Sequence, residues 1–155
     1  MHRLLIPTAV AVGALLVSGL ATPVGVQAHD GATGVVKERM DMMKSFSAEL
    51  KAVARMFKGE TAYDPVAVAA AARRIEAHSG AHLLRMFPEG SDDPPSKASD
   101  EIWTHWAEFE AKADDLGTRA SALAGVADAG PDAARRAFGE LAGTCKACHL
   151  DFEVD

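Results

Sequence analysis

Cys145, Cys148 and His149 are the residues of this chain whose types and spacing point most directly to chemistry. Two thiols three residues apart, followed at once by an imidazole, form the sequence that attaches a c-type haem. The cysteines add across the porphyrin vinyl groups, and the histidine becomes the proximal iron ligand. On a helix these three residues lie within about one turn of each other and share a face. The motif therefore predicts one covalently bound haem c.

Two other kinds of site use a pair of cysteines with this spacing. A thioredoxin-like redox pair needs a βαβ context and sits at the start of a helix, where the dipole lowers the thiol pKa. A zinc site needs two further ligands, and the chain has only two cysteines. A helical bundle whose Cys145 and Cys148 work as thiols or bind zinc stays as the alternative without haem.

The first 28 residues have the features of a secretory signal peptide. Arg3 supplies the charged start, residues 4–20 are apolar and uncharged, and Val26-Gln27-Ala28 is a small-x-small cleavage sequence. The apolar run is too short for stable membrane insertion. Cleavage leaves one domain, residues 29–155. Haem is attached outside the cytoplasm in bacteria, so the signal and the motif together predict a periplasmic protein.

The mature domain is acidic. Residues 1–28 hold one of the 16 basic residues and none of the 22 acidic ones, so the formal charge after cleavage is −7. A surface with this excess of carboxylates disfavours binding to nucleic acid. The chain has no grouping of serine, histidine and carboxylate and no phosphate-binding glycine loop, so we expect no enzymatic activity of the hydrolytic or phosphoryl-transfer kind.

Apolar residues at spacings of three and four predict four helices and no strand. Gly59 is placed to stop the first helix, Asp64 and Pro65 to start the second, and Pro131 to start the fourth. Residues 88–98 form a loop, and the layout is an all-α, antiparallel up-down-up-down four-helix bundle with the haem near the C-terminal end of helix four. The expected helices span 35–58, 65 to about 87, 99 or 100 to about 125, and 131 onward. The expected core stripe of the first helix is Val36, Met40, Met43, Phe46, Leu50, Val53 and Phe57.

In this layout the first and last helices are antiparallel neighbours, so residues 39–43 should lie level with the haem motif. Met43 at this level is expected to ligate the iron through its thioether, to cover the open iron position, or simply to pack in the core. Arg39 at the edge of the stripe is expected to bind a haem propionate or to extend along the bundle end toward water.

Two other histidines and the two tryptophans are weaker candidates for a role in binding a metal or cofactor. His78 and His82 lie four residues apart on the second helix and could clasp a metal, but without further ligands a solvated pair is favoured. We expect Trp103 and Trp106 to fill the core and close its end.

With these residues placed, the mature chain resembles the cytochrome c′ family, the class II c-type cytochromes of bacterial periplasms, over almost its full length. The position of the motif at the end of a four-helix pattern, together with the Arg-x-x-x-Met-Lys stretch, is more specific than the motif alone. The matching stretches are Arg39 through Met43-Lys44, Lys58-Gly59-Glu60 with Tyr63-Asp64, Phe87-Pro88-Glu89-Gly90, Glu101-Ile102-Trp103, Ala137-Phe138-Gly139, and Cys145 to His149 with Phe152.

The resemblance implies haem bound through Cys145 and Cys148, His149 as proximal ligand, and Met43 facing the sixth position. In most members that residue leaves iron five-coordinate and high-spin, so that nitric oxide and carbon monoxide can enter. In a low-spin branch, methionine at this position binds the iron, and the protein carries electrons between redox partner proteins. Many members are homodimers that pair through the first two helices, and we carry that expectation over.

One residue departs from the pattern of the resemblance. The family commonly has a basic residue four after the proximal histidine, where this chain has Glu153. An acid there should alter the electrostatics on the proximal side, and it would strengthen the basicity of the imidazole if it reached the ring N–H.

Overall fold

The computed structural model describes residues 31–92 and 94–154. This part of the chain contains six α-helices and one short 3-10 helix, joined by turns and loops. The signal peptide predicted at 1–28 lies outside these residues and stays a prediction. Within the described ranges there is no strand, only an isolated bridge between Ala98 and Glu153. In chain order the elements are α1 (Gly34–Phe57), α2 (Pro65–Ala77), α3 (Ala81–Leu84), α4 (Glu101–Thr104), α5 (Trp106–Val126), η1 (Ala127–Ala129) and α6 (Pro131–Phe152).

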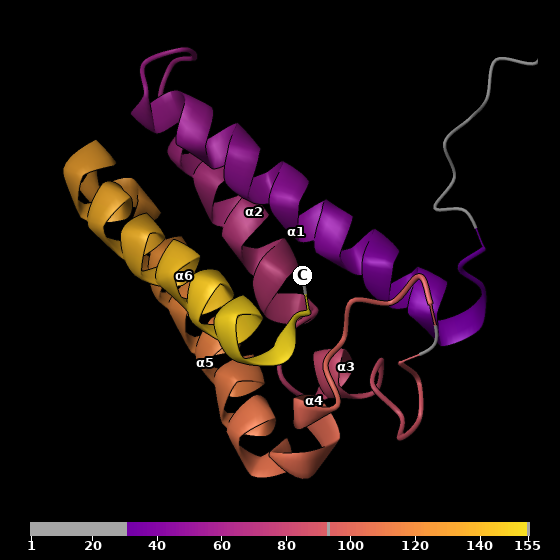
Figure 1. Ribbon diagram of the computed structural model, residues 1–155. Helices are drawn as coiled ribbons and strands as arrows, with labels where there is room; N and C mark the ends of the chain where they lie inside the picture. Colours follow the sequence, from indigo (N-terminus) through magenta and orange to yellow (C-terminus); the bar gives the residue numbers. More distant parts are fainter. Residues whose placement is uncertain (1–30, 93, 155) are drawn as a thin grey trace, which may run out of the picture.

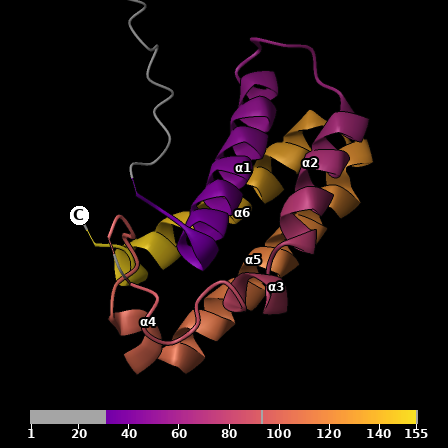
Figure 2. The ribbon, with the colours of Figure 1, turned by 90° about the vertical axis from the view of Figure 1, so that its right-hand side faces the viewer.

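The helices α1, α2, α5 and α6 form the antiparallel four-helix bundle that the sequence predicts (Figure 1). α5 packs extensively against both α2 and α6, and α1 packs against α2 (Figure 2). The contact between α1 and α6 is much smaller. The short helices α3 and α4 and the loop between them lie at the end of the bundle where α6 ends (Figures 1 and 2).

The buried stripe of α1 begins differently from the expected one. Arg39 and Met42 are buried in its second and third turns, whereas Met40 and Met43 are only half-buried. From Phe46 onward the stripe runs as predicted, apart from a half-buried Leu50. The first turns are rotated because Arg39 is hydrogen-bonded to the loop between α3 and α4. Met43 consequently lies at the edge of the core, facing the space between α1 and α6.

The second helix starts where the sequence predicts but stops earlier. The carboxylate of Asp64 accepts hydrogen bonds from the backbone N–H groups of Val66 and Ala67, which caps α2. The expectation that the helix continues to about residue 87 is wrong, because α2 ends at Ala77. Gly80 has a φ of +52° and donates its N–H to the carbonyl oxygen of Ala113 on α5, so the chain turns before α3 begins.

Replacing Gly80 with alanine should destabilise the bundle by about 2 kcal/mol, because an L side chain rarely adopts this φ. The new Cβ would also lie 3.0 Å from Oδ1 of Asp114. Urea unfolding followed by circular dichroism measures the change. Gly139→Ala is the matched control, because Gly139 is helical and has open space around it; we expect that variant to be as stable as the parent or up to about 1 kcal/mol more stable. Equal stability of the two variants would contradict the prediction.

The third helix is interrupted near its start. A single helix from residue 99 or 100 was expected, but His105, with φ −119° and ψ 43°, separates α4 from α5. The interruption rotates Trp106 away from the core, and this residue is 36% exposed. The expectation that Trp106 fills the core is therefore wrong, whereas Trp103 is half-buried and donates its ring N–H to the carbonyl oxygen of Phe87 at 3.2 Å.

Aromatic contacts join the elements at the end of the bundle where α6 ends. The ring of Phe109 on α5 meets Phe87 and Phe152 edge-on, at centroid distances of 4.8 and 5.3 Å. Such edge-to-face pairs favour one defined arrangement of the rings. They hold the last turn of α6, which follows the predicted haem motif, against α5 and the α3–α4 region. In the described part of the chain, no helix is both long and apolar enough to span a bilayer.

Candidate functional site

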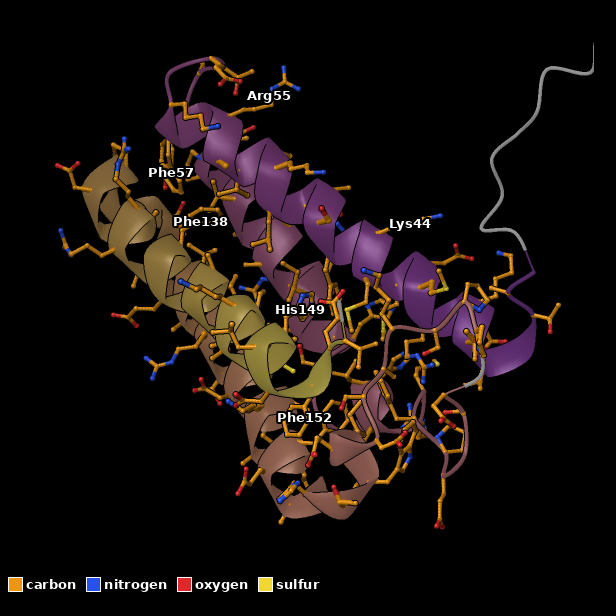
Figure 3. The ribbon with its side chains drawn as sticks, viewed as in Figure 1. Lys44, Arg55, Phe57, Phe138, His149 and Phe152 are labelled. Carbon is orange, nitrogen blue, oxygen red and sulfur yellow. The ribbon has the colours of Figure 1, made fainter. Side chains whose placement is uncertain are left out.

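The predicted haem motif lies on the last turns of α6, with both cysteines facing inward. Cys145 and Cys148 are half-buried, pack against the core cluster and are free thiols. His149 follows on the same end of the helix with its side chain about half exposed. Figure 3 shows His149 on the end of α6, facing the side of the molecule on which α1 carries Lys44.

Two cavities, each about 360 Å³, lie between α6, α1 and the end of the bundle. Met43 on α1 and Cys148 and His149 on α6 line both of them, so the cavities meet between these side chains. Each has the volume of a small-molecule site. They occupy the region in which α1 makes little contact with α6. The expectation that residues 39–43 lie level with the motif is confirmed.

The cavity walls are mostly apolar, and the charged groups that line them are almost all basic. Three basic residues line the first cavity and two line the second, against a single acidic residue, Glu153. This balance is the reverse of the chain as a whole, which carries an excess of carboxylates. Such a site suits an apolar molecule that carries negative groups. The basic residues are Arg39, Lys44 and Lys97 in the first cavity, and Lys51 and Lys112 in the second.

Arg39 is the most buried charged side chain at the site, with 4% of its surface exposed. One terminal nitrogen donates to the carbonyl oxygen of Met86 and to Oγ of Ser91, both at 3.2 Å. The other donates to the carbonyl oxygen of Ser91 at 2.7 Å and to Oγ of Ser96 at 2.6 Å. The guanidinium also lies over the ring of Phe87, 4.4 Å from its centroid. The expectation that Arg39 extends toward water is therefore wrong.

Burial lowers the pKa of Arg39, and the charge of Asp92 opposes this effect. Within residues 31–92 and 94–154, no carboxylate forms an ion pair with Arg39. Four of the five guanidinium N–H groups are used by the loop, which leaves the Nε–H for another acceptor. Arg39 could give a haem propionate one hydrogen bond, and Lys44 and Lys97 on the same cavity would supply further positive charge.

Glu153 reaches the ring of His149. The imidazole Nδ1 and the carboxylate Oε2 are 2.8 Å apart, within one turn at the end of α6. The pair is an ion pair when His149 is protonated; in a neutral ring whose proton is on Nδ1, beside this carboxylate, the lone pair of Nε2 is left for a metal ion. From the sequence this approach was raised only as a condition, and the structure places the carboxylate against the ring.

Comparison with known proteins agrees with the fold. The family model described as Cytochrome C′ matches residues 34–153. A cytochrome c-556 of Agrobacterium fabrum is 33% identical over 123 residues, which cover 79% of this chain and 83% of that protein. The cytochrome c′ of Cereibacter sphaeroides is 32% identical over 162 residues and 99% of each chain.

The chain belongs to the cytochrome c′ family. Among solved structures, the nitric oxide complex of a mutant cytochrome c prime from Alcaligenes xylosoxidans superimposes with a TM-score of 0.69 at 28% identity, covering 78% of this chain and 94% of that one. Cytochrome c′ is itself a known example of the up-down-up-down bundle. The resemblance stated from the sequence is thus confirmed, and membership of the family implies a haem c cofactor.

The donor groups at the site fit haem c better than they fit the thiol alternatives. Burial raises the pKa of the Cys145 thiol, and burial, partly offset by Lys112, raises the pKa of Cys148 to about 11. A raised thiol pKa disfavours the thiolate, through which a redox pair works. Among the residues described, no three histidine, cysteine or acidic side chains are placed to hold a metal ion. Nothing here supports the zinc or redox-thiol alternative.

The other predicted metal candidates lie elsewhere. The rings of His78 and His82 are 4.8 Å apart between centroids, edge to face, on the surface of α2 and α3. Nδ1 of His78 lies 2.8 Å from the carbonyl oxygen of Arg74, and Nδ1 of His82 lies 3.3 Å from a guanidinium nitrogen of Arg85. Neither histidine lines the two cavities. The solvated pair is the interpretation that these contacts favour.

Sequence reasoning missed the part of the site that comes from the α3–α4 loop. Ser91 and Ser96 hold Arg39, while Pro95, Ser96, Lys97 and Ala98 line the first cavity. Periodicity carries no signal for an irregular loop. The stretch Phe87 to Gly90, which matches the family, was the only indication that this region matters.

Proposed function

We propose that this protein carries one haem c, joined to Cys145 and Cys148 and bound at the iron by His149, and that it takes up nitric oxide and carbon monoxide at a five-coordinate iron. The observation that carries the proposal is the shared lining of the two cavities. His149 from α6 and Met43 from α1 line both cavities, so a planar cofactor held by the cysteines would have one residue toward each of its faces.

The residues of the chain have separate tasks in this proposal. Cys145 and Cys148 tether the cofactor and set its position along α6. His149 would hold the iron through Nε2, since its Nδ1 lies against the carboxylate of Glu153. When bound, the haem supplies the iron that changes oxidation state and binds a gas. The lysines and the remaining N–H of Arg39 neutralise the propionates.

The opposite face determines whether a gas can enter. α1 contains no histidine, and Met43 is its one sulfur-bearing residue that lines both cavities, since Met40 lines only the first. A half-buried methionine at the edge of the core can move aside for a diatomic molecule. The solved relative from Alcaligenes xylosoxidans is a nitric oxide complex, which supports uptake of the same gas by this chain.

A second candidate function belongs to the same family and is favoured by the same placement of Met43. If its thioether binds the iron, the protein is a six-coordinate, low-spin electron carrier with Met43 and His149 as axial ligands. In both cases we propose single-electron exchange with redox partner proteins, and neither proposal requires an enzyme. Export by residues 1–28 to the periplasm and pairing of two copies through α1 and α2 are proposals carried by the signal pattern and by the family.

The absorption spectrum of the mature protein tests the proposal. The full chain is produced in a host that attaches haem c, and the ferric and ferrous forms are recorded with and without carbon monoxide. We expect high-spin spectra, a ferrous form altered by carbon monoxide, and a mass increase of about 616 Da for covalent haem. A low-spin ferric spectrum with the weak absorption of a methionine–iron bond would establish the electron carrier instead. Loss of all colour on acid extraction would contradict covalent attachment and both candidates.

A further inference from the structure

The bond between His149 and Glu153 joins the proposed iron ligand to the one acidic side chain that lines the cavities. The 2.8 Å between Nδ1 and Oε2 makes this a close ion pair when the ring is protonated, with the carboxylate charge directly against the imidazole. A carboxylate in contact with Nδ1 stabilises positive charge on the imidazole and so makes Nε2 a stronger donor to a metal ion.

The backbone around Glu153 is held firmly, so this contact does not depend on a loose chain end. The N–H of Glu153 donates to the carbonyl oxygen of His149 at 3.1 Å. On either side, Ser99 donates to the carbonyl oxygen of Phe152 at 3.0 Å, and Val154 donates to that of Lys97 at 2.9 Å. The α3–α4 loop therefore fixes residue 153 in an extended conformation beside the imidazole.

The charge of Glu153 is directed at His149 and not at a lysine. The neighbouring acid, Asp151, is paired with Lys112 at 2.9 Å. Within the part of the chain that the structure describes, the ion pair of Glu153 is with His149 alone. Asp151 thus carries the same charge two residues away, but it is already balanced and does not touch the ring.

We propose that Glu153 is a positioning residue that strengthens His149 as an iron ligand and favours the ferric over the ferrous state. This inference rests on the proposed binding of haem c at His149. A full negative charge one imidazole away from the iron stabilises the state with the higher positive charge. A stronger donor at Nε2 would also strengthen the bond from His149 to the iron, so that the histidine stays attached when a gas binds on the Met43 side.

The test compares Glu153→Gln with Asp151→Asn in the mature haem protein. Each substitution removes one negative charge and keeps the shape of the side chain, but only the first weakens the bond to Nδ1. Two measurements are made: the iron–histidine stretching frequency of the ferrous form by resonance Raman, and the reduction potential. A third variant, Glu153→Lys, introduces the basic residue that the cytochrome c′ family commonly has at this position.

For Glu153→Gln we expect a lower stretching frequency and a ferric–ferrous equilibrium shifted about tenfold toward ferrous, which is about 59 mV for one electron. Glu153→Lys should shift both quantities further in the same direction. Asp151→Asn should leave the stretching frequency unchanged and shift the equilibrium less than about twofold, because its charge is balanced and exposed to water. Equal shifts in Glu153→Gln and Asp151→Asn, or an unchanged frequency in Glu153→Gln, would overturn the inference.

This outcome is distinct from failure of the proposed function. A parent protein without covalent haem contradicts the proposed function, and the inference falls with it. A parent protein with low-spin iron contradicts only uptake of gas at an open position, since the potentials of the variants still report on Glu153.

Discussion

Replacing Met43 with alanine is expected to raise the affinity of the ferrous protein for carbon monoxide by about tenfold to a hundredfold. Met43 lines both cavities together with His149, and in the proposed complex it lies on the face of the haem that a gas would approach. Forcing extra atoms into a filled space costs about 1–3 kcal/mol, and 1.4 kcal/mol corresponds to a factor of ten in affinity. Alanine removes the side chain that has to move. Titration with carbon monoxide, followed by absorption, measures the change.

Met43→Leu is the matched control, because leucine keeps an apolar side chain of similar volume but has no sulfur. If Met43 only covers the iron, Met43→Leu should retain the high-spin spectrum and bind carbon monoxide within about threefold of the parent. If the thioether is a ligand, both variants should convert a low-spin spectrum to high-spin. An unchanged affinity in Met43→Ala, with a high-spin parent, would contradict the assignment of Met43 to the gas-binding face.

Replacing Arg39 with leucine should destabilise the mature protein by about 3 kcal/mol. The side chain donates four hydrogen bonds to Met86, Ser91 and Ser96, and hydrogen bonds to a charged group contribute about 1.5–3 kcal/mol each when removed singly, without being additive. Leucine also leaves the buried hydroxyl of Ser91 without this partner. Urea unfolding, followed by circular dichroism and by haem absorption, measures the loss.

Two control variants separate the contribution of the Arg39 hydrogen bonds to stability from the contribution of its charge. Arg39→Lys keeps the positive charge but cannot span both serines with a planar fork, so we expect it to recover less than half of the loss. Arg73→Leu removes an exposed arginine of α2 and should change the unfolding free energy by less than about 0.5 kcal/mol. If Arg39→Lys were as stable as the parent, the charge, and not the hydrogen-bonded loop, would explain the burial of Arg39.

Local signals in the sequence predicted most of the secondary structure correctly. Asp64 with Pro65, Gly59 and Pro131 mark helix ends through capping, positive φ and a missing donor, and each does so in the structure. The errors occurred where one residue breaks a periodic pattern. At Gly80 and His105 the apolar spacing continues through the break, so periodicity alone extends α2 too far and joins α4 to α5.

The shape of the cavities depends on contacts between segments that are distant in the chain. α1 turns Arg39 inward because Ser91 and Ser96, some fifty residues later, accept its hydrogen bonds. That rotation buries Met42 and leaves Met43 facing the cavities. Periodicity predicts which residues share a face, but it does not predict the partner against which that face packs.

By itself the sequence determined the four-helix class and the face shared by Cys145, Cys148 and His149, because helix periodicity and capping act over a few residues. Only the tertiary structure decided three features: the cavities between α1 and α6, the hydrogen bonds from Arg39 to the α3–α4 loop, and the backbone hydrogen bonds that hold Glu153 beside His149. These features need packing and hydrogen bonds between segments far apart in the chain, and no local pattern encodes the geometry of such contacts.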